Sequence, residues 1–174
     1  AGFVVSNVKD NSAYSELLLD NLSHGGGGIN QGFELGNLTE YLLTSDGLGT
    51  SFAMASTSAT PLSGDPYTST QGDFFAVIQG LSTGVSTSGF RNATGQTGTV
   101  GSILETAITL APGEKFSFDW AFLGNDKIPF NDFALFYLQD PQSGVIVFSE
   151  ILAQIGSPRF PLAAISLLLD VGCW

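Results

Sequence analysis

The chain has 174 residues and a formal net charge of −11, and 43% of its residues are hydrophobic. This length is typical of one domain that buries about 70% of its unfolded surface, and this hydrophobic fraction argues against disorder. The excess of carboxylates would repel phosphate backbones and anionic lipid surfaces, so we expect no nucleic-acid partner.

Composition also bears on the membrane and on cellular location. The sequence contains no run of about 18 apolar residues, so we expect no membrane span. The chain opens with Ala1 rather than Met, and few lysines accompany many Gly, Ser and Thr residues. These features indicate a processed protein that is secreted or displayed on a cell surface. Cys173 is the single cysteine, so no disulfide can form within the chain, and either pairing between chains or burial remains open.

Residues 1–28 are predicted to form an N-terminal arm with a glycine hinge. GFVV (2–5) has the pattern of a short strand, and the glycines at 25–28 impose almost no backbone conformation. Two interpretations remain open. The arm either docks as a strand on its own domain, or it pairs with the open sheet edge of another copy. The residues that would make the second contact are Phe3, Val4 and Val5.

Two segments have helical spacing. Tyr14, Leu17 and Leu18 follow an i, i+3, i+4 pattern, which predicts a short helix ending near Asn21. SEILAQI (149–155) is a weaker helix candidate.

The most informative stretch is FSFDWAFLGNDKIPFNDFALFYL (116–138). Phe116, Phe118, Trp120 and Phe122 recur at every second position, which predicts a strand with one buried face. Trp120 is therefore expected in the core, and Asp119 is expected on the opposite side. FALFYL (133–138) is apolar on both faces, which is typical of a central strand covered on both sides.

Other apolar runs predict further strands. FFAVI (74–78) and VGSILETAITL (100–110) are strand candidates, and residues 79–99 are expected to form a long loop or an edge. The Pro-Gly turn at 111–115 predicts a hairpin over 100–122, and the turn at 139–144 predicts a hairpin with the strand that follows. These elements predict an all-β, antiparallel β-sandwich.

Four stretches resemble one family. They are GFELGNLTEYLLTSDG (32–47), GDPYTSTQGDFFAVIQG (64–80), the 116–138 stretch as a long central hairpin, and SLLLDVG (166–172) as a closing strand. In this order they resemble the galactose-binding-like jelly rolls of carbohydrate-binding modules and of bacterial PEP-CTERM (choice-of-anchor) surface proteins. The resemblance implies a jelly-roll domain over residues 29–174.

One departure from the family concerns the sheet edge. Family members usually place a further hairpin before the closing strand, and only a short interval with Pro158 and Pro161 stands there in this chain. A sandwich that lacks a strand has unpaired backbone groups, which a strand donated by another copy could satisfy. The fold prediction therefore includes exchange of the N-terminal strand between subunits.

The family resemblance also implies a structural calcium ion where the opening and closing strands meet. The matching positions are Glu34, Asp73 and Asp170, with carbonyl groups of the 44–49 loop completing the shell. The other interpretation is that these carboxylates lie on a sheet rim or stabilise turns. Asp126, Asn131 and Asp132 form a second acidic group, for which turn stabilisation is the favoured role.

Sugar binding is the alternative function that the resemblance implies, through exposed aromatic side chains. Tyr41 and Tyr67 are the candidates. Catalysis is not expected. His24 is the single histidine and adjoins the glycines, a poor place to hold a base. The available carboxylates have no sequence context that would raise their pKa values.

We therefore expect an exported, non-enzymatic module of a surface, matrix or filament that self-associates through strand donation. The alternative is a carbohydrate-binding module with a structural calcium ion and a polysaccharide partner.

Overall fold

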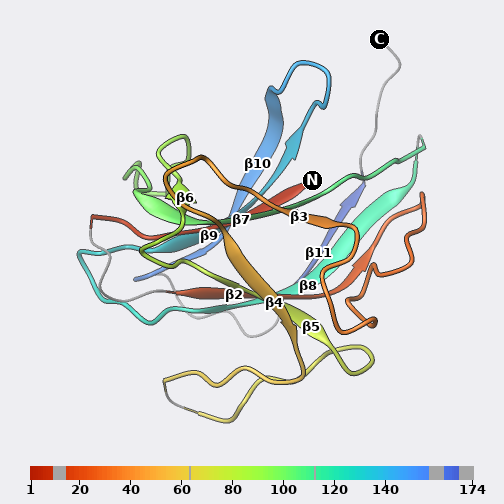
Figure 1. The fold of residues 1–174 in the computed structure, drawn as a ribbon, viewed down its shortest axis with the longest axis horizontal. Helices are drawn as coiled ribbons and strands as arrows, with labels where there is room; N and C mark the ends of the chain where they lie inside the picture. The colour runs from red at the N-terminus through yellow and green to blue at the C-terminus, as the bar shows by residue number, and fades with distance from the viewer. Residues whose placement is uncertain (10–14, 63, 112, 157–162, 169–174) are drawn as a thin grey trace.

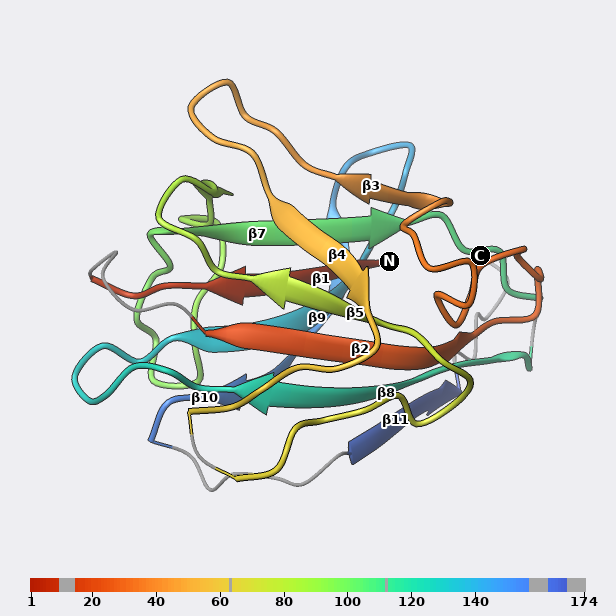
Figure 2. The ribbon, with the colours of Figure 1, turned by 60° about the horizontal axis from the view of Figure 1, so that its bottom comes forward.

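The computed structural model describes residues 1–9, 15–62, 64–111, 113–156 and, as backbone, 163–168. All regular elements in these ranges are β-strands, and the strands pair antiparallel. Two sheets pack as a sandwich (Figures 1 and 2), which confirms the predicted fold class. The jelly-roll topology stays a prediction. None of the described residues belongs to a helix long and apolar enough to cross a membrane.

Each sheet takes strands from along the whole chain. The six-stranded sheet has the order β10-β9-β1-β7-β3, with β6 also paired to β7. Its strands are β1 (Gly2–Ser6), β3 (Tyr41–Leu43), β6 (Val85–Ser86), β7 (Val100–Thr106), β9 (Phe133–Gln139) and β10 (Ile146–Gln154). The five-stranded sheet has the order β11-β8-β2-β5-β4. Its strands are β2 (Glu16–Ser23), β4 (Phe52–Ser56), β5 (Phe75–Gln79), β8 (Lys115–Leu123) and β11 (Ala163–Leu168).

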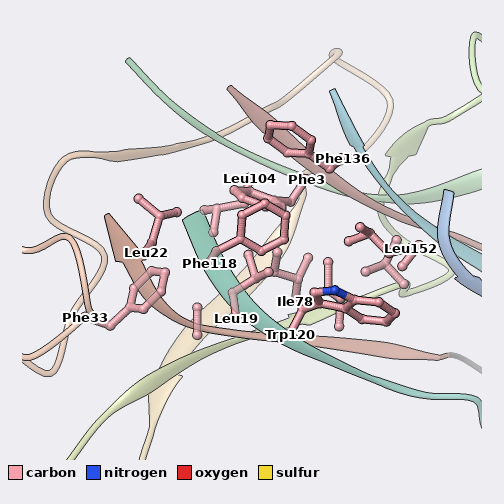
Figure 3. Close-up of a cluster of buried hydrophobic side chains, with 14 of the residues drawn as sticks. Phe3, Leu19, Leu22, Phe33, Ile78, Leu104, Phe118, Trp120, Phe136 and Leu152 are labelled. Atoms are coloured by element: carbon pink, nitrogen blue, oxygen red, sulfur yellow. The ribbon is translucent and has the colours of Figure 1, made fainter. Parts of the chain in front are cut away.

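Aromatic side chains fill the space between the sheets (Figure 3). The Phe136 ring of β9 lies 5.3 Å from the ring of Phe3, 5.2 Å from that of Phe118 and 5.4 Å from that of Phe116, between centroids. Trp120 is buried in this core, as predicted. Residues from β1, β8 and β9 therefore meet in one inter-sheet cluster, and burial of their apolar surface is the main stabilising term.

The outer face of each sheet is also covered, by a loop. Val85 and Phe90 lie within the 81–99 segment, which contains the short strand β6. They pack against Val4 and Leu135 on the six-stranded sheet. Tyr67 packs on the outer face of the five-stranded sheet, against a cluster formed by Leu18, Ala59, Phe75, Val77, Ala121 and Leu123. β9 is accordingly buried on both faces, which confirms the prediction made from FALFYL.

The two helix predictions are wrong. Leu17 faces the inter-sheet core and Leu18 faces the outer cluster, so both belong to the strand β2. A strand buried on both faces is a continuous apolar run, which can imitate helical spacing over a few residues. Tyr14 lies outside the described residues. Most of the 149–155 segment belongs to β10.

One predicted hairpin is confirmed and two are wrong. β9 and β10 are antiparallel neighbours, and within their turn Asp140 donates its N–H to the Val145 carbonyl. β7 and β8 lie in different sheets, and so do β8 and β9. The 100–122 and 116–138 segments therefore cross between the sheets. Their turns connect strands whose apolar faces meet across the core.

Residues 1–28 contribute the central strand of each sheet. β1 pairs with β7 on one side and β9 on the other, and β2 pairs with β5 and β8. In the single chain the N-terminal strand therefore docks on its own domain, which is the first of the two interpretations. Exchange of β1 between copies stays a prediction.

Candidate functional site

The 29–40 segment is a series of turns held by two polar side chains. The buried Asn30 donates its Nδ2 hydrogens to the Asn37 and Thr39 carbonyl groups, and its Oδ1 accepts from Leu35 N–H. Glu40 accepts hydrogen bonds from Ile29 N–H and Asn30 N–H, at 3.0 and 2.9 Å. These bonds fix the position of the segment that carries Glu34.

Two of the three predicted calcium ligands lie together. Asp73 donates its backbone N–H to Glu34 Oε2 at 2.9 Å. Gly72 has φ of +64°, and a Cβ atom at this position would overlap the Glu34 carboxylate. The left-handed backbone favours glycine here, and a larger residue would also displace the Glu34 carboxylate from its bond to Asp73 N–H.

A polar cavity of about 300 Å³ adjoins this carboxylate. The polar side chains that line it belong to Asn21, Ser23, Asn30, Gln31, Glu34 and Gln71. These are oxygen-bearing amide, hydroxyl and carboxylate groups, and oxygen is the ligand that Ca²⁺ prefers. Of the predicted ligands Glu34 and Asp73, only Glu34 lines this cavity, so it supplies the carboxylate and the other oxygens are amide and hydroxyl groups.

The 44–49 loop does not join Glu34 and Asp73. Asp170 lies outside the described residues. Phe52, which follows the 44–49 loop, pairs with Gln79 at the end of β5, whereas Asp73 precedes the start of β5. The 44–49 loop therefore lies at the opposite end of this strand, and its predicted part in the calcium shell is wrong. Among the described residues, no three His, Cys, Asp or Glu side chains are grouped as a metal site.

Asp132, in the second acidic group, bonds to residues far away in the chain, in addition to any part in its own turn. The Asp132 carboxylate is fully buried and accepts hydrogen bonds from Val8 N–H and Ser15 Oγ, at 3.2 and 3.0 Å. Asp126 accepts a hydrogen bond from Lys127 N–H.

Tyr41 is half-buried at the edge of the six-stranded sheet. Its ring stacks on Phe33 with a centroid separation of 4.7 Å, and its hydroxyl donates to the Gln31 carbonyl at 2.8 Å. Burial, with a smaller contribution from Glu40, raises the pKa of the Tyr41 hydroxyl above its ordinary value. Part of the Tyr41 ring is therefore occupied by the protein itself.

Tyr41 also lines a groove of about 680 Å³. Other polar side chains of this groove are Glu40, Glu105, Thr106, Tyr137 and Gln139. Tyr137 donates its hydroxyl to Glu105, and burial followed by this contact raises the Tyr137 pKa. The groove combines aromatic rings, which can stack on a sugar ring, with carboxylate and amide groups, which can bond to sugar hydroxyls.

Tyr67, the other predicted sugar-binding residue, lies elsewhere. Its backbone forms a bridge with Ala59, and its ring packs on the outer face of the five-stranded sheet. Tyr41 packs against the inter-sheet core instead. The structure does not bring the two tyrosines into one site.

Phe3, Val4 and Val5, the predicted subunit contacts, are fully buried in the single chain. Donation of this strand to another copy would require it to leave the centre of its own sheet. The subunit contact through these residues stays a prediction.

A pair of aspartates was not singled out from the sequence. Asp20 and Asp119 face each other across β2 and β8, and Thr70 Oγ1 lies 2.9 Å from Asp20 Oδ2 and 2.7 Å from Asp119 Oδ2. Asp20 is buried and also accepts from Gln71 N–H at 3.0 Å. The pair fastens the end of the 57–72 loop to the sheet. In the sequence, the position of Asp119 between aromatic residues indicated a carboxylate on the outer face of a strand. Its contact with Asp20 could not be predicted, because it depends on the register between β2 and β8.

Comparisons with known proteins leave the chain without an assigned family, because no family model, curated protein or solved structure matches it.

Proposed function

We propose that the chain is an exported, non-enzymatic structural or adhesive module that assembles with other copies through its sheet edges. The observation that carries this proposal is the presence of exposed apolar side chains on edge strands. On the β9–β10 hairpin, Val145, Ile146 and Val147 are 57%, 40% and 67% exposed. On β4, Phe52 and Met54 are 39% and 46% exposed.

An edge strand presents unpaired N–H and C=O groups, and apolar side chains beside them favour pairing with another strand. The net charge of −11 opposes contact between copies. Assembly should therefore strengthen when salt screens this repulsion.

The test is analytical ultracentrifugation and negative-stain electron microscopy of the full chain at about 0.05 M and about 0.5 M salt, where the Debye length differs roughly threefold. We expect oligomers or fibres whose fraction rises with protein concentration and with salt. A chain that stays monomeric at all concentrations in both buffers would contradict an assembly function.

The second candidate function is a carbohydrate-binding module with a structural calcium ion. It is favoured by the contact between Glu34 and Asp73 beside the polar cavity, and by the groove that Tyr41 and Gln139 line. Bound calcium would stabilise the fold, by about 2.7 kcal/mol at a concentration 100 times its Kd.

This candidate predicts that calcium raises the melting temperature by several degrees and that Glu34→Gln removes the shift. Asp65→Asn, which removes an exposed carboxylate elsewhere, should keep it. On polysaccharide columns the chain should be retained, and Gln139→Ala should weaken retention more than Tyr67→Ala. An unchanged melting temperature would exclude the ion, and passage through all columns would exclude the sugar.

A further inference from the structure

The edge strands of the two sheets differ in the features that prevent pairing with a strand of another molecule. β10 has register shifts between Ile146 and Phe148 and between Ile151 and Ala153. It also carries Glu150 opposite Phe136, whose ring lies in the inter-sheet core. Bulges and charges on the inward side are devices that protect an edge from pairing. β3, at the other edge of that sheet, has only three residues.

β4 has none of these protective features. Its five residues, Phe52–Ser56, pair with β5 in an uninterrupted register and include neither proline nor a charged side chain. In the part of the chain that the structure describes, β4 ends the five-stranded sheet and no strand pairs with its second edge.

The open edge of β4 follows from the hydrogen bonds at the end of β5. Gly80 donates its backbone N–H to the Ser15 carbonyl on the β2 side, so the alternate residues Gln79 and Val77 direct their main-chain groups toward β4. Their partners Phe52 and Met54 therefore face β5, and Ser102 Oγ bridges Phe52 N–H and the Gln79 carbonyl. The N–H and C=O groups of Ala53 and Ala55 lie on the open edge.

The side chains beside this edge suit contact with an identical surface. Phe52 and Met54 pair with Gln79 and Val77, and Val77 belongs to the outer cluster, so both exposed side chains lie on the outer face. Residues 47–64 contain no charged side chain. Each copy has a net charge of −11, and this uncharged segment lets two copies approach with little local repulsion.

We propose that β4 pairs with β4 of a second copy of this chain, antiparallel about a two-fold axis at Met54. This inference rests on the proposed assembly through sheet edges and names the edge and the partner. The open-edge residues Ala53 and Ala55 are symmetric about Met54. Ala53 and Ala55 of the second copy exchange both N–H to C=O bonds across the axis, and the two Met54 residues lie directly opposite each other without a main-chain bond.

Strand direction supports a two-fold contact over a head-to-tail contact. The five strands of the sheet alternate in direction, so its two edge strands, β11 and β4, run the same way. Joining β4 of one copy to β11 of the next by translation would need a parallel pair. A two-fold axis makes an antiparallel pair like every other pair in the sheet.

The first test is disulfide trapping in a Cys173→Ser background. Residues directly opposite in a non-hydrogen-bonded antiparallel pair have Cα atoms about 4.5 Å apart, within the range of a disulfide. We expect Met54→Cys to form a covalent dimer under mild oxidation. Val147→Cys, at an exposed position of β10, is the control and should form far less.

The second test compares Met54→Lys with Val147→Lys by sedimentation. Both variants change the net charge from −11 to −10, so a difference between them reflects position. Lysines directly opposite each other repel, and we expect Met54→Lys to raise the dimer Kd about tenfold or more with an unchanged melting temperature. Val147→Lys tests the other apolar edge, β10, and should raise the Kd far less than Met54→Lys.

Each outcome decides a different point. Assembly that survives Met54→Lys but is lost in Val147→Lys overturns the β4 contact and leaves edge assembly in place. A wild-type chain that stays monomeric overturns edge assembly itself. Loss of assembly only in Met54→Lys, with trapping at position 54, supports the two-fold contact.

Discussion

Asp46 shows how one exposed side chain organises a loop. Its Oδ1 accepts from Leu48 N–H and Gly49 N–H, each at 2.9 Å, and its Oδ2 accepts from Ser86 N–H at 2.7 Å. The bond from Ser86 and then those from the two loop amides lower the Asp46 pKa below its ordinary value. The ionised carboxylate thus ties the loop before β4 to β6.

We predict that Asp46→Asn lowers the melting temperature at pH 7. An Asn side chain has one acceptor oxygen and cannot take all three bonds. Because the folded-state pKa is lowered, the wild-type advantage is present above the unfolded-state pKa of about 4 and is lost as the pH falls through the folded-state pKa. The melting temperatures of the wild type and Asp46→Asn should therefore differ at pH 7 and coincide at about pH 2. Equal melting temperatures at pH 7 would contradict this role for Asp46.

At the scale of the element, the 57–72 loop covers one outer face of the sandwich. Its Tyr67 ring packs over the outer cluster, and its end is bonded to the buried Asp20 through Thr70 and Gln71. A buried carboxylate with several donors is a stronger tether than the apolar contact alone.

We predict that Asp20→Asn destabilises the fold by about 1–3 kcal/mol, because buried N–H groups lose a charged acceptor. Hydrogen exchange should accelerate most in residues 64–72. Asp119→Asn is the matched control. It removes the partly exposed member of the pair and relieves a like-charge contact across the strands. Equal effects of the two substitutions in urea denaturation would contradict a specific role for Asp20.

At the scale of the whole molecule, the two sheets are built around the N-terminal segment. β1 and β2 occupy the middle position in the orders of their sheets (Figure 2). Phe3, Val5 and Leu19 of these strands belong to the inter-sheet core. Neither sheet retains a continuous ladder when these strands are removed.

We therefore predict that deletion of residues 1–24 abolishes cooperative folding. Near-ultraviolet circular dichroism and thermal melts should show loss of the native transition, while Met54→Lys keeps it. Recovery of the native spectrum on addition of the 1–24 peptide would support exchange of these strands between copies. A cooperative transition in the 25–174 fragment alone would contradict the central role of the segment.

The sequence by itself determined where most strands lie and which faces they bury. Alternation of Phe116, Phe118 and Trp120 required a strand with one buried face, because side chains two apart share a side. The run FALFYL required cover on both faces. The family resemblance implied Glu34 and Asp73 as calcium ligands; Asp73 N–H bonds to the Glu34 carboxylate, and the calcium role stays a prediction.

The tertiary structure decided which strands pair and which polar groups meet. A turn such as 111–115 can close a hairpin or cross between sheets, and only the burial of Leu104 and Phe116 on facing sheets selects the crossing. The encounter of Asp20 with Asp119 depends on a register set by distant residues. Apolar runs specify local geometry through backbone periodicity, whereas pairing depends on the surface buried when the whole chain closes.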